Sequence, residues 1–167
     1  MTKNIFKTKI SDLIYVKRNY LDKKLCNKII KEYEPGDKTY ISSREIINRR
    51  NSFQRKEIDM QLSKIIQSSM KIYLRDIWKD IIFSQNQGFC LNKMNKGDRN
   101  IETNYNWKTI LIYLLNDDFQ GGNFCVQGVD QKLKQGDLIM FPSCWMFPYE
   151  VKKITKGSRY NLITGTW

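Results

Sequence analysis

The side chains that could carry chemistry are few, and histidine is missing altogether from the 167 residues. Without imidazole the chain cannot build a Ser-His-Asp triad, a Cys-His pair, or an iron site of two histidines and a carboxylate. Four cysteines are present, with no CxxC spacing among them, so a four-thiolate zinc site is disfavoured. We interpret them as reduced, mostly buried small residues: Cys26, Cys90, Cys125 and Cys144.

Charge is the second informative property. The chain has 29 Lys and Arg against 17 Asp and Glu, a formal net charge of +12. Such an excess is typical of proteins that meet polyanions, and nucleic acid is one candidate partner. The lysines are nevertheless spread over the chain, and the densest basic run, Arg44 to Arg55, accompanies no recognition motif. A compositional bias of the source genome would explain the positive charge equally simply. We therefore expect a protein partner or self-assembly before nucleic acid.

The first half of the chain reads mainly as helix. Residues 13–18 predict a short strand, and Asp22 is a good helix N-cap before apolar residues at helical spacing. Pro35 and Gly36 end that helix. Ile46 and Ile47 suggest a short strand, and an amphipathic pattern predicts a long helix over 56–79.

The second half reads as a series of strands. The apolar run 109–115 predicts a strand buried on both faces, and Asp117 and Asp118 after it are typical turn formers. Further strands are predicted over 88–94, 123–127, 131–134, 137–141, 149–154 and 160–167. Helices followed by strands indicate an α+β chain, expected as a single domain over 1–167. Its helical part covers about 19–84 and its β-rich core about 88–167.

Two segments of the core carry a family resemblance. The first is 112–124 (IYLLNDDFQGGNF), and the second is 134–151 (KQGDLIMFPSCWMFPYEV) with 155–160 (TKGSRY). Together they resemble the catalytic domain of prolyl 4-hydroxylase-like dioxygenases that depend on 2-oxoglutarate and iron(II), a compact form of which phages often encode. The resemblance implies a double-stranded β-helix, a cupin-like jelly-roll, with the N-terminal helices packed on one sheet.

The resemblance also shows which site residues have been replaced. In the family, a His-x-Asp pair and a second histidine hold iron; the matching positions here are Glu102, Asn104 and Tyr149. A phenol and an amide are poor ligands for ferrous iron, so we expect no metal site and no catalytic residue. Met94 stands where the family often has a pocket tyrosine. Arg159 matches the basic residue that pairs with the distal carboxylate of 2-oxoglutarate, and a guanidinium suits that task.

These observations predict a catalytically inactive dioxygenase-like protein that serves as a structural, assembly or binding module. The resemblance adds the expectation of a phage origin, with a place in the host cytoplasm or the virion. No long apolar segment is present, so we expect no membrane contact. We expect no cofactor either. Two alternatives stay open: an active hydroxylase that holds iron through Glu102 and Tyr149 and uses 2-oxoglutarate, and a polyanion-binding protein. Trp145, Met146 and Phe147 are interpreted as lid, core or interface residues.

Overall fold

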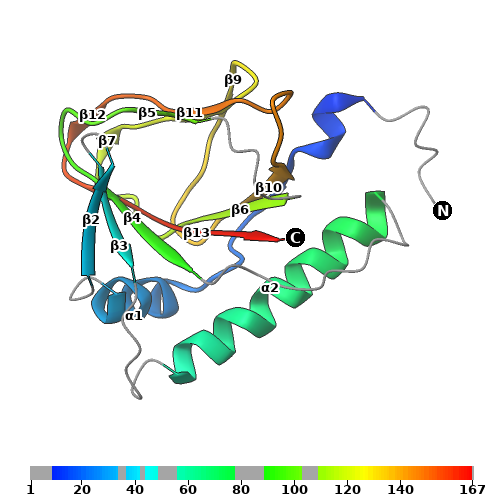
Figure 1. Ribbon diagram of the computed structural model, residues 1–167, viewed down its shortest axis with the longest axis horizontal. Coiled ribbons are helices and arrows are strands. Elements are labelled where there is room, and N and C mark those ends of the chain that lie inside the picture. Colours follow the sequence, from blue (N-terminus) through cyan, green and yellow to red (C-terminus); the bar gives the residue numbers. More distant parts are fainter. Residues whose placement is uncertain are drawn as a thin grey trace.

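A computed structural model describes residues 9–33, 37–41, 44–48, 56–77, 89–102 and 109–166. Two helices lie on one side of a large sheet, and a smaller sheet covers its other side (Figure 1). The fold is therefore layered, in the order helices, large sheet and small sheet. This agrees with the predicted α+β class and with helices packed on one sheet only.

The helices begin where the sequence supplies a cap or an apolar stripe. Helix α1 (Lys23–Tyr33) starts after Asp22, whose carboxylate accepts a hydrogen bond from the backbone N–H of Leu25 at 2.7 Å. This bond satisfies one of the free N–H groups of the first turn. Helix α2 (Lys56–Ile77) is the long amphipathic helix of the sequence analysis. A single 3-10 turn, η2 (Ile10–Leu13), precedes the first strand.

The large sheet has seven strands in the order β1-β10-β6-β13-β4-β3-β2, and every pair is antiparallel. Strands from both ends of the chain are therefore hydrogen-bonded in one sheet. The strands are β1 (Tyr15–Lys17), β2 (Asp37–Ile41), β3 (Arg44–Asn48), β4 (Cys90–Met94), β6 (Thr109–Leu114), β10 (Leu138–Pro142) and β13 (Arg159–Thr166).

The small sheet has four strands in the order β5-β11-β8-β9, and a separate pair joins β12 to β7. The two larger sheets face each other across an apolar interior, which makes the barrel-like double-stranded β-helix. The strands are β5 (Asn100–Glu102), β7 (Gln120–Gly121), β8 (Phe124–Val126), β9 (Val129–Gln131), β11 (Tyr149–Val151) and β12 (Ile154–Lys156).

Two apolar clusters hold these layers together. Alternate residues of a strand point to opposite faces, so β6 sends Leu111 and Tyr113 toward the helices and Ile110 and Ile112 toward the small sheet. All six residues of β6 are buried, as its nearly continuous apolar run predicts. The barrel interior is thus the space between the two sheets, and the helices take no part in it.

The structure corrects two of the predicted strands. The predicted strand 131–134 is instead β9 (Val129–Gln131), because the chain reverses at Gln127 and Gly128, both with positive φ (53° and 76°). A two-residue turn of this kind sets the register of the hairpin that follows it. The predicted strand 149–154 is two strands, since the chain leaves the small sheet after Val151 to pair with β7.

The N-terminal part is less helical than predicted. The hairpin β2–β3 lies between the two helices in the chain and extends the large sheet beside β4. The sequence analysis recognised β3 through Ile46 and Ile47 but missed β2, and it also missed β5. The predicted C-terminal ends of the two helices, at Pro35 and near residue 79, lie outside the described residues. Within the described ranges, neither helix has the length and apolar character that crossing a bilayer requires.

The packing of α2 onto the sheet can be tested with two methionines of the same helix. Met70 is 1% exposed and Met60 is 55% exposed. Met70→Ala should lower the free energy of unfolding by about 3 kcal/mol, because it leaves a cavity beneath the sheet. Met60→Ala should change it by less than about 0.5 kcal/mol. Urea unfolding followed by circular dichroism measures both, and equal losses would contradict the placement of α2.

Candidate functional site

Tyr149, the first residue of β11, lies inside the barrel and belongs to an aromatic cluster. Its ring stacks on Phe124, with centroids 5.5 Å apart and planes 29° apart. It also meets Phe141 edge-on at 5.4 Å. The side chain is only 4% exposed. Tyr149, which the sequence resemblance matches to the family's second histidine, therefore packs against aromatic rings between the two sheets.

The other two matched positions are less fully placed. In the antiparallel pairing of β5 with β11, the backbone of Glu102 stands directly opposite that of Tyr149. The structure thus places the backbones of two of the three matched positions side by side. Asn104 lies outside the described residues.

Arg159, the first residue of β13, has the largest side chain among the fully buried ones that the structure describes. Its side chain is 2% exposed, and its backbone is opposite Met94 of β4, which is itself fully buried. The guanidinium donates from Nε to Oδ1 of Asn161 at 3.1 Å and from NH1 to the carbonyl oxygen of Gly122 at 2.5 Å. Its carbon lies 5.3 Å from the ring centroid of Phe119. The guanidinium is thus held at a defined place by two hydrogen bonds and an aromatic face.

One arm of this guanidinium has nothing to bind. The NH2 atom of Arg159 is buried and has no hydrogen-bond partner among the residues that the structure describes. No carboxylate in those residues forms an ion pair with it either. By contrast the buried carboxylate of Asp137 is 2.6 Å from Arg18 NH1 and also accepts two backbone N–H bonds. Among the side chains that the structure describes, Arg159 is therefore a buried cation without a counter-ion.

Burial alone lowers the pKa of Arg159 to about 9, because removing the guanidinium from water disfavours its charged form. The group still carries its proton at neutral pH. A buried ion without a counter-ion is costly, and an anion at the NH2 arm would offset that cost. The electrostatics of the interior thus favour a small negatively charged ligand.

The guanidinium has polar neighbours that the sequence analysis did not single out. Asn161 follows Arg159 at i+2 on β13 and lies on the same face, and its cross-strand partner on β4 is Asn92. Both asparagines are buried, and Oδ1 of Asn92 has no hydrogen-bond partner in the described residues. The period of two along β13 could have revealed Asn161, whereas the cross-strand neighbour depends on register.

The three residues interpreted as lid, core or interface differ in their exposure. Trp145 and Met146 are exposed, at 70% and 44%, while Phe147 is buried in the interior cluster. Asp117 and Asp118 are exposed in the loop after β6, as expected of turn formers. Asp118 accepts a hydrogen bond from the side-chain amide of Asn116.

Iron does not fit this donor set. The sequence has no histidine, and the described residues contain no group of three or more Cys, Asp or Glu that could hold a metal ion. Iron(II) oxygenase sites need two imidazoles and a carboxylate, and the tyrosine present is packed among phenylalanines. The buried NH2 arm of Arg159, which has no hydrogen-bond partner among the described residues, is a charged donor of the kind that binds carboxylates.

Comparison with known proteins finds likeness in structure only. No family model and no curated protein matches the sequence. An oxidoreductase of the 2OG-Fe(II) oxygenase family from Burkholderia pseudomallei superimposes with a TM-score of 0.71 at 13% identity, covering 96% of this chain and 90% of that one. A prolyl hydroxylase from Trichoplax adhaerens, in complex with a hypoxia inducible factor peptide fragment, gives 0.74 at 14%, covering 93% and 83%.

A viral example is equally similar. The collagen prolyl hydroxylase of Paramecium bursaria Chlorella virus-1, in its 2OG complex, gives a TM-score of 0.71 at 12% identity, covering 92% of this chain and 94% of that one. Identities this low establish the fold and leave the chemistry to the site residues. The chain has the double-stranded β-helix fold shared by the 2-oxoglutarate and iron(II) oxygenases, prolyl hydroxylases among them.

Proposed function

We propose that this protein is a non-catalytic relative of these oxygenases, which uses the barrel interior to bind a small carboxylate without iron. The observation that carries the proposal is the buried NH2 arm of Arg159, which has no partner among the described residues. A module with a purely structural role would gain from replacing such a cation with an apolar side chain. The retained, oriented guanidinium therefore favours a binding role over an inert one.

The missing iron ligands and the buried arginine together support one mode of binding, in which Arg159 holds a carboxylate without a metal. In the fold family, iron supplies the redox chemistry and is chelated by the 2-oxo acid end of 2-oxoglutarate. Here Arg159 would hold a distal carboxylate, with Asn161 and Gly122 fixing the guanidinium. Without chelation the 2-oxo group adds nothing to affinity, so any small acid with a well-placed carboxylate should bind. The phage origin and the assembly role remain predictions of the sequence resemblance.

The absence of catalysis can be tested directly. The protein incubated with iron(II), ascorbate and 2-oxoglutarate should form no succinate above the protein-free background, because the imidazole ligands are missing. Manganese(II), a stable substitute, should leave the melting temperature unchanged. Turnover would overturn the proposal. In that case Tyr149→Phe would show whether the phenol is a ligand, since this change removes only the oxygen.

Carboxylate binding should depend on Arg159 and be independent of metal. Added 2-oxoglutarate and glutarate should both raise the melting temperature, while dimethyl glutarate, whose two esters carry no negative charge, should not. Arg159→Met should abolish the increase, and Arg159→Lys should weaken binding at least about tenfold by removing the planar fork. Arg99→Met, at an exposed arginine, is the matched control. Unchanged binding by Arg159→Met would refute the proposal.

The same binding should fall at high pH. The ligand needs the charged guanidinium, and burial lowers the pKa of Arg159 to about 9 in the ligand-free protein. The glutarate affinity should be flat from about pH 6 to about pH 8, where both partners keep their charge, and decrease as the pH rises through 9. Calorimetric titration in matched buffers measures this. A constant affinity up to about pH 11 would argue that Arg159 is not the binding group.

A further inference from the structure

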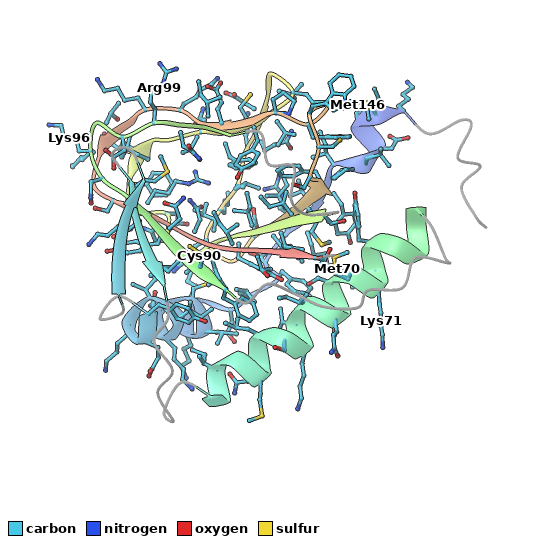
Figure 2. The ribbon with its side chains drawn as sticks, in the orientation of Figure 1. Met70, Lys71, Cys90, Lys96, Arg99 and Met146 are labelled. Carbon is cyan, nitrogen blue, oxygen red and sulfur yellow. The ribbon has the colours of Figure 1, made fainter. Side chains whose placement is uncertain are left out.

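The outer surfaces of the two helices carry several exposed lysines that take no part in the proposed carboxylate site. The apolar faces of α1 and α2 pack on the same side of the large sheet and join one core cluster (Figure 1). Their opposite faces point away from the sheet, as Lys71 does below α2 while Met70 points inward (Figure 2). We call this surface the helical lysine face; its exposed lysines are Lys23, Lys24, Lys28, Lys31, Lys64 and Lys71.

The lysines are regularly placed. On α1, Lys24, Lys28 and Lys31 follow at steps of four and three, and on α2, Lys64 and Lys71 are seven residues apart. These steps keep side chains on one face of a helix, with about 10 Å between residues seven apart. The face therefore presents two rows of positive charge.

Acidic groups do little to neutralise these rows. Among the described side chains of α1 and its cap, Asp22 bonds the backbone of Leu25 and Glu32 is only partly exposed. Along the described exposed side of α2, from residue 60 to residue 72, no acidic residue occurs. The recorded ion pairs of the described residues lie elsewhere, between Arg18 and Asp137 and between Lys152 and Asp130. The charge of this face is thus available to a partner.

We propose that the helical lysine face binds the phosphate backbone of nucleic acid. Double-stranded DNA carries one negative charge per about 1.7 Å of its axis, so two rows of lysines can neutralise several phosphates at once. The other exposed residues of the face are mostly polar, and the side-chain amides of Asn27, Gln61 and Gln67 can donate to phosphate oxygens. No base-reading motif is involved, so binding is independent of sequence.

The same features favour nucleic acid over an anionic membrane. A helix that binds a bilayer surface inserts a free apolar face into the lipid. Here the apolar faces of both helices are buried against the sheet, and Met60 is the exposed large apolar residue on the described part of this surface. The lysine face can offer charge and hydrogen bonds but has no apolar wedge.

The test compares two variants of equal charge. Lys24→Gln, Lys28→Gln, Lys64→Gln and Lys71→Gln together remove four charges from the helical lysine face. The control removes four from the opposite side of the molecule, where Lys96 and Arg99 project (Figure 2), by Lys96→Gln, Arg99→Gln, Lys153→Gln and Lys156→Gln. Melting curves should show both variants folded, because every changed residue is exposed.

Fluorescence anisotropy with a labelled mixed-sequence DNA duplex measures binding at several salt concentrations. The unaltered protein should show a slope of log K against log salt of about −5, as expected for six phosphate contacts. The helical variant should bind more than about tenfold more weakly with a slope near −2, and the control should keep most of its affinity. Equal losses in both variants, no binding by the unaltered protein, or binding only to phosphatidylserine vesicles would each overturn the proposal. None of these results depends on Arg159.

Discussion

Coverage of the large sheet on both faces is the constraint on which the rest of this structure depends. Strands β6, β10 and β13 lie in its middle, with helices on one side and the small sheet on the other. Because side chains alternate along a strand, each residue of these strands must enter one of two separate cores. In β13, Leu162 goes to the helical core, while Arg159 and Asn161 go into the barrel. The sheet thus places a charged side chain in a dry space.

That placement makes Arg159 the most informative residue in the molecule. Natural interiors seldom keep a buried ion without a counter-ion, because removal from water is costly and only pairing compensates it. Among the described residues the barrel does so at Arg159, whereas the buried Asp137 is paired with Arg18 and with two backbone N–H groups. This contrast is the physical basis of the proposed ligand, because one arm of an oriented cation has no partner in the described part of the chain.

The barrel interior has an apolar part and a polar part. Around Tyr149 it is aromatic, because this ring stacks on Phe124 and meets Phe141 edge-on. Around Arg159 it is polar, since Asn161 and Asn92 are buried there as well. A fold shared with oxygenases does not by itself establish their chemistry, because that chemistry depends on a few ligands and the fold depends on many apolar contacts.

The sequence by itself determined the fold class, the long helix, the buried strand β6 and the absence of imidazole, since these follow from periodicity and composition. Its resemblance to a known family also pointed to Tyr149, Glu102 and Arg159. Tertiary structure alone decided the register that sets Asn92 opposite Asn161, the hairpin turn at Gly128, and the joining of β2 to the large sheet. It also decided that Arg159 is buried, with no acidic partner among the described side chains. Cross-strand neighbours and burial depend on contacts between residues far apart in the chain, which local sequence patterns do not encode.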